Sequence, residues 1–216
     1  MTKWLRAGVL FAALPAVSLQ AADLESLHAF NVNWDLKPGW TLQLHTRGRT
    51  FENMGEYNQL RAGPVLIWQA SRRFTSLSGY YLTDQNTRVA PQRFRVHRPW
   101  WAGQYRLVSG GKWALDGRAG VERMLSARFD DYWRGRARII VSRATPIGHA
   151  TATSEGIRER GVWYGRLTAG LQWKVQKNVT FGAGYEYRDA ARGQGSHVIA
   201  TTLSWDARRA PPALGD

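Results

Sequence analysis

The sequence contains no cysteine, and after its first 21 residues it contains no long apolar run. Without cysteine there is no disulfide and no thiolate metal site. Without a second apolar run there is no further membrane-spanning helix, because such a helix needs roughly 20 apolar residues. Acidic residues are also scarce, 16 against 30 Lys and Arg, which gives a formal net charge of +14. This balance favours nucleic acid, an anionic membrane surface or an anionic ligand as a partner.

Residues 1–21 have the three parts of a secretory signal peptide. Lys3 and Arg6 are the charged part, residues 7–19 are apolar, and Leu19-Gln20-Ala21 is a plausible cleavage site. The apolar part is shorter than a spanning helix, which favours cleavage over an uncleaved anchor. We therefore expect an exported protein, and export argues against nucleic acid as the partner.

The remainder of the chain alternates between apolar and polar residues, which predicts β-strands because successive side chains of a strand point to opposite faces. Leu167, Ala169 and Leu171, for example, alternate with a set that includes Arg166, Thr168 and Gln172. The pattern gives about eleven strands, the weakest of them in the small, polar stretch 147–155.

Aromatic residues mark the ends of these strands. Six tryptophans lie beside short polar turns: Trp34, Trp40, Trp68, Trp113, Trp173 and Trp205. A second group adjoins longer polar segments (48–56, 84–95, 125–131, 155–161 and 189–195): Tyr57, Tyr81, Trp101, Tyr132, Trp133, Trp163 and Tyr187. Two aromatic girdles, with short turns on one side and longer loops on the other, are typical of outer-membrane barrels. A soluble barrel or sandwich is the alternative, but it would need these aromatics in mid-strand to fill its core.

We therefore predict an all-β protein, an antiparallel transmembrane β-barrel of the outer-membrane type. Because single-chain bacterial barrels usually have an even number of strands, we expect about 12, with ten as the alternative. The barrel would cover residues 22–205, after a signal peptide over 1–21 and before a disordered tail over 206–216. The predicted location is the outer membrane of a Gram-negative cell.

Several segments resemble an uncharacterised bacterial family, the domain of unknown function 2490 family. The resemblance rests on His97-Arg98-Pro99-Trp100-Trp101, on 118–123 and on 133–138, with a looser fit at 154–156 and 165–170. The family tends to have an acidic residue where this chain has His97, which removes one partner for Arg98. The resemblance implies a small outer-membrane barrel, and it implies no activity, substrate or catalytic residue.

The polar faces of the strands would line an interior rich in arginine. Eight candidate binding residues share this face: Arg61, Arg98, Arg106, Arg118, Arg134, Arg136, Arg138 and Arg166, beside Arg47 and Arg188. Acids with the same parity are fewer: Asp35, Asp84, Asp116, Glu122 and Glu186. Guanidinium groups bind oxyanions with two parallel hydrogen bonds, so this face favours a narrow, porin-like, anion-preferring pore or an anion-binding barrel. In the alternative, ion pairs close the interior, and outer loops of a structural barrel bind a ligand or lipopolysaccharide.

Catalytic signals are weak. No Gly-x-Ser-x-Gly occurs, and Ser196 and His197 are adjacent, which sends their side chains to opposite strand faces. An outer-membrane hydrolase therefore stays a distant alternative, and we expect no catalytic residue, cofactor or metal site. Trp133 and Arg134 also point to opposite faces, which disfavours nucleic acid. The expected partners are outer-membrane lipid, lipopolysaccharide and a small anionic solute, and the expected state is a monomer.

Overall fold

The computed structural model describes residues 23–51, 54–86, 92–189 and 195–207. These residues form eleven strands: β1 (Asp23–Lys37), β2 (Trp40–Phe51), β3 (Glu56–Gln69), β4 (Phe74–Asn86), β5 (Arg93–Gly110), β6 (Trp113–Ser126), β7 (Phe129–Thr145), β8 (Gly148–Glu159), β9 (Val162–Gln176), β10 (Val179–Arg188) and β11 (Ser196–Asp206). The predicted signal peptide and the tail from residue 208 onward lie outside the described residues. Asp206, which was predicted to begin the tail, is the last residue of β11.

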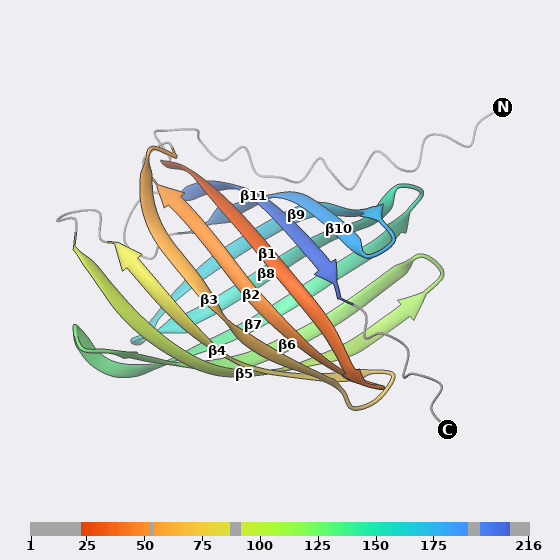
Figure 1. The fold of residues 1–216 in the computed structure, drawn as a ribbon, viewed down its shortest axis with the longest axis horizontal. Coiled ribbons are helices and arrows are strands. Elements are labelled where there is room, and N and C mark those ends of the chain that lie inside the picture. The colour runs from red at the N-terminus through yellow and green to blue at the C-terminus, as the bar shows by residue number, and fades with distance from the viewer. Residues whose placement is uncertain (1–22, 52–53, 87–91, 190–194, 208–216) are drawn as a thin grey trace, which may run out of the picture.

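The strands form a closed barrel in chain order, with β1 beside β11 (Figure 1). Each strand pairs antiparallel with the next, and β1 pairs in parallel with β11. The parallel closure follows from the odd number, since successive strands reverse direction and the first and the eleventh therefore run the same way. The predicted all-β barrel is confirmed. The described strands number eleven, between the expected twelve and the alternative ten, and the closing pair is the exception to the antiparallel pattern.

Two connections are shorter than the sequence predicted. The segments 125–131 and 155–161 were expected as longer loops, but the strands continue through most of them. The β6–β7 turn consists of 127–128, and the β8–β9 turn consists of Arg160 and Gly161. Both residues of the second turn have a positive φ, 49° and 80°, which matches the twist of a tight hairpin. The weakly predicted strand around 147–155 is present as β8.

The barrel has charged side chains inside and large apolar side chains outside. Arg98 and Glu122 are each 4% exposed, whereas Trp133 and Trp163 are 63% and 62% exposed. A soluble barrel packs mainly apolar side chains inward, whereas this interior contains charged side chains beside buried apolar ones such as Val96 and Ile157. Within the described residues, no helix is long and apolar enough to cross a membrane.

Strand β4 has the opposite orientation to the one expected. Tyr81 was predicted to join the outer girdle, but it is buried, and its ring stacks on Trp100 with centroids 5.5 Å apart. Gly79 makes room for this pair, because a Cβ there would lie 2.8 Å from Trp100 Nε1. Asp84, three residues beyond Tyr81, therefore points outward rather than into the interior. Tyr132, also placed in the girdle, lines the interior cavity.

Candidate functional site: the arginine-lined interior

The barrel encloses a cavity of about 800 Å³. Seven of the eight predicted binding residues line it: Arg61, Arg98, Arg118, Arg134, Arg136, Arg138 and Arg166. The eighth, Arg106, lies near the β5–β6 turn, donates a hydrogen bond to Asp116 and does not line this cavity. Three further arginines line the cavity: Arg47, Arg49 and Arg188.

Glu122 on β6 is the first centre of an interior ion-pair network. Arg98 Nη2 on β5 and Arg136 Nη1 on β7 each lie 2.7 Å from its carboxylate oxygens. Arg134, two residues before Arg136 and on the same face of β7, also donates to this carboxylate. Three guanidinium groups from two strands thus share one buried carboxylate, which stabilises it as an anion.

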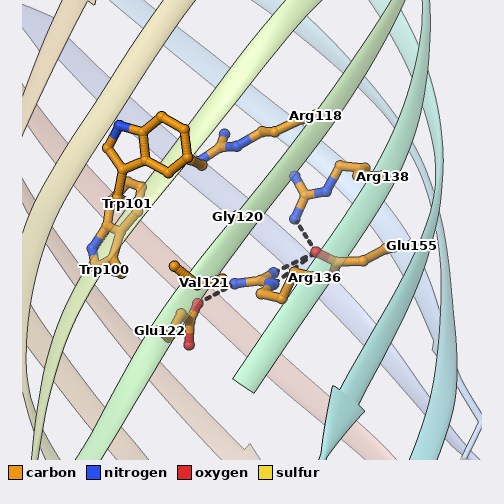
Figure 2. Close-up of a pocket in the computed structure, with 10 residues that line it drawn as sticks. Trp100, Trp101, Arg118, Gly120, Val121, Glu122, Arg136, Arg138 and Glu155 are labelled. Atoms are coloured by element: carbon orange, nitrogen blue, oxygen red, sulfur yellow. Dashed lines mark hydrogen bonds and ion pairs between the residues drawn. The ribbon is translucent and has the colours of Figure 1, made fainter. Parts of the chain in front are cut away.

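Glu155 on β8 is the second centre. Its carboxylate lies 2.6 Å from Arg136 Nη2, 3.0 Å from Arg138 Nη2 and 3.4 Å from Arg166 Nη1. Figure 2 shows Arg136 lying between the two centres, with one ion pair to Glu122 and another to Glu155. Arg136 therefore joins strands β6, β7 and β8 through charge as well as through backbone pairing.

The network continues around the barrel. Arg166 Nε lies 3.5 Å from Glu186, which also accepts from Arg188. Arg188 Nη1 lies 3.6 Å from Glu25 on β1, and Glu25 pairs in turn with Arg49 on β2. We call this set the ion-pair belt, and its members are Arg49, Glu25, Arg188, Glu186, Arg166, Glu155, Arg138, Arg136, Arg134, Glu122 and Arg98. The belt links β5 to β2 by way of β6 to β10 and β1.

The interior retains an excess of positive charge. Ten arginines line the cavity, and five glutamates bond to them: Glu25, Glu122, Glu155, Glu159 and Glu186. Within the part of the chain that the structure describes, ten cations against five anions leave a formal excess of five positive charges. The ion-pair belt therefore does not neutralise the interior, and most of its members line the cavity that remains.

Strands β2 and β3 carry arginines that form no ion pair with a carboxylate of the described residues. Arg47 Nη2 donates to Gln59 at 2.9 Å, and Arg61 Nη2 donates to His45 Nε2 at 3.1 Å. The Arg61 guanidinium lies 4.3 Å from the centre of the Tyr81 ring. The recorded contacts of Arg47 and Arg61 are thus with neutral acceptors and an aromatic ring. Among the described residues, no carboxylate pairs with these two arginines.

Strand parity identified the arginines but missed three of their partners. Glu25, which lies shortly after the expected cleavage site, was not among the predicted acids. Glu155 ended the weakly predicted strand 147–155 and Glu159 fell in the longer segment 155–161, so neither was placed on the inner face, whereas both point into the barrel from β8. The alternation of Thr151, Thr153 and Glu155 along β8 was the signal that could have found them. Among the described residues, no group of three metal-binding side chains is placed to hold a metal ion.

The comparison with protein families matches most of the barrel. The model of the family described as Protein of unknown function (DUF2490) matches residues 25–198, a span that contains the whole ion-pair belt. No curated protein and no solved structure matches the chain. Because the matched span covers well over half of the sequence, the chain belongs to the DUF2490 family.

Proposed function

We propose that this protein is an outer-membrane β-barrel whose positively charged interior is a narrow, anion-preferring passage or binding site. The location is supported by the inverted polarity of the barrel, with apolar side chains outside and charged side chains inside. Strand length agrees, because the shortest strand, β10, has ten residues. A strand tilted by about 45° needs roughly 9–11 residues to cross the apolar part of a bilayer.

The observation that carries the anion preference is the excess of arginine around the cavity. Rings and ladders of arginine select anions because each passing anion exchanges water for a charged hydrogen-bond donor. The ion-pair belt occupies part of the cross-section, so the solute that fits beside it is small. Arg118 is expected to contribute most directly to the anion preference. It lines the cavity and lies over the Trp100 ring at 5.7 Å, without a carboxylate partner among the described residues.

The expected result in a planar bilayer under a potassium chloride gradient is a reversal potential that reports preference for chloride. Arg118→Gln should reduce this preference, because it removes one uncompensated cavity charge. The matched control is Arg123→Gln, which removes an exposed arginine that pairs with Asp131 outside the barrel. Preference for potassium, or an equal loss in both variants, would contradict the anion-preferring interior. Absence of any conductance would reject the passage and leave the binding role, which requires no transport.

A second function, lipopolysaccharide binding, is favoured by a basic and aromatic surface at one end of the barrel. Exposed arginines gather at the β6–β7 and β8–β9 turns and on neighbouring strand ends: Arg93, Arg95, Arg123, Arg128, Arg158 and Arg160. The exposed rings of Trp133 and Trp163 lie among them. Arginine pairs with phosphate through two parallel hydrogen bonds, and Trp prefers the boundary between tails and headgroups. This surface therefore has the side chains that would bind a phosphorylated lipid headgroup.

Replacing Arg128 with serine, and in a separate variant Arg158 with serine, should each weaken binding of the folded protein to vesicles that contain lipopolysaccharide. Each basic residue near an anionic surface contributes about 1 kcal/mol, so about fivefold in affinity should be lost for each replacement. The control is Arg143→Ser, since Arg143 is exposed and lies over a Trp113 ring at 4.9 Å, at the opposite end of the barrel. An equal loss with Arg143→Ser would show only general charge attraction and would reject this surface.

A further inference from the structure

Two arginines face each other directly inside the barrel without a carboxylate between them. Arg47 on β2 is the register partner of Arg61 on β3, and both line the cavity. Like charges directly opposite each other on neighbouring strands are destabilising. Arg166 and Arg188 are also register partners, but both of these arginines lie within ion-pair distance of Glu186. The Arg47–Arg61 pair has no such carboxylate among the residues that the structure describes.

Both guanidinium groups keep unused hydrogen-bond donors. Arg61 is 7% exposed, and the Nε atoms of Arg47 and Arg61 are buried without a hydrogen-bond partner among the residues described. The partners that they do have, Gln59 and His45, are side chains that supply no negative charge. A buried charge without a counter-ion is costly, and the cost is relieved when an anion binds beside it.

We propose that Arg47 and Arg61 form a binding site for a small free oxyanion of the phosphate or sulfate type. Two guanidinium forks match an anion with several acceptor oxygens better than they match a halide. Tyr81 supports the site from behind, because its ring holds the Arg61 guanidinium on one side and stacks on Trp100 on the other. The site deepens the proposed function, since it opens into the same positively charged cavity, but it requires no passage through the barrel.

Gln59 offers a direct way to test the site. Its Oε1 already accepts from Arg47, so Gln59→Glu places a carboxylate at the pair with almost no change in shape. The internal carboxylate should then replace the bound anion. The matched control is Gln172→Glu, which adds the same charge to the cavity wall on β9, away from β2 and β3. Arg47→Gln is a second variant, which removes one fork of the site.

The measurement is calorimetric titration of the folded protein in detergent with sodium phosphate, with ionic strength held constant by sodium chloride. Phosphate should bind the unaltered protein with a stoichiometry near one, and sulfate should compete where chloride does not. Gln59→Glu and Arg47→Gln should each weaken phosphate binding by at least about tenfold, equivalent to about 1.4 kcal/mol. Gln172→Glu should change the affinity much less.

Three results would overturn the site. The first is absence of phosphate binding by the unaltered protein. This result rejects the site even where a variant fails to fold. Chloride could compete as well as sulfate, which would point to general charge attraction. Gln172→Glu could weaken binding as much as Gln59→Glu, which would place the effect in the whole cavity. Failure of the conductance experiment alone would reject the passage and leave this site standing, because the titration does not depend on transport.

Discussion

Replacing Glu122 with glutamine is expected to destabilise the barrel by about 3–5 kcal/mol, the range found when one partner of a buried ion pair is removed. Glu122 is 4% exposed and accepts from Arg98, Arg134 and Arg136. Arg136 keeps Glu155, and Arg134 keeps Glu159 at 3.4 Å. Arg98, itself 4% exposed, keeps no carboxylate among the described residues, so most of the loss should arise there. The measurement is urea unfolding of the protein after refolding into lipid vesicles.

The control is Asp131→Asn, which breaks the 3.3 Å pair with Arg123 on the outer surface. Both partners of that pair are about half exposed, so its loss should cost less than about 1 kcal/mol. Equal unfolding midpoints for Glu122→Gln and Asp131→Asn would show that the ion-pair belt contributes no stability. Glu122→Gln also bears on the proposed function. It removes one interior anion, so preference for chloride should increase wherever conductance is observed.

The strands were predictable because most of them carry one polarity on each face. On β9, Leu167 and Ala169 are exposed outside while Arg166 and Thr168 line the cavity, as the alternation indicates. The seven predicted arginines that line the cavity were found by the same rule. The strand number was harder, since the pattern itself gave about eleven and only the preference for even numbers raised the expectation to twelve.

Strand β4 shows where alternation fails. Tyr80 and Tyr81 are adjacent, so both faces of the strand carry an aromatic ring and the pattern does not distinguish them. The orientation is decided by Trp100 on β5, which stacks on Tyr81 inside the barrel. This contact joins two strands, and it becomes visible only when their register is known.

The ion-pair partners could not be predicted from the sequence either, because they also depend on the register between strands. Parity places Arg138 and Arg166 on the inner face, but it does not state that both meet Glu155. Glu155 lies between them because β8 is paired with β7 on one side and with β9 on the other. A local pattern gives the face of a side chain, whereas its partner follows from pairing between strands.

The second large effect is expected on the outer surface at the middle of β9. Ala169 is exposed there, and in the proposed membrane location it contacts lipid tails. Ala169→Arg should therefore cost about 2–4 kcal/mol, the range for arginine at the centre of a bilayer. The expected result is poor folding into lipid vesicles, measured as loss of heat-modifiable mobility on gels, together with reduced recovery from the outer-membrane fraction.

Thr168→Arg is the matched control, since it introduces the same side chain one residue away on the opposite face. Thr168 lines the cavity, and its register partner on β10 is Glu186, so a new guanidinium there has a carboxylate within reach. Folding of Thr168→Arg should therefore stay close to that of the unaltered protein. Equal tolerance of the two variants, or recovery of the unaltered protein as a soluble periplasmic species, would contradict the membrane location, because a lipid-facing Ala169 position should not accept arginine.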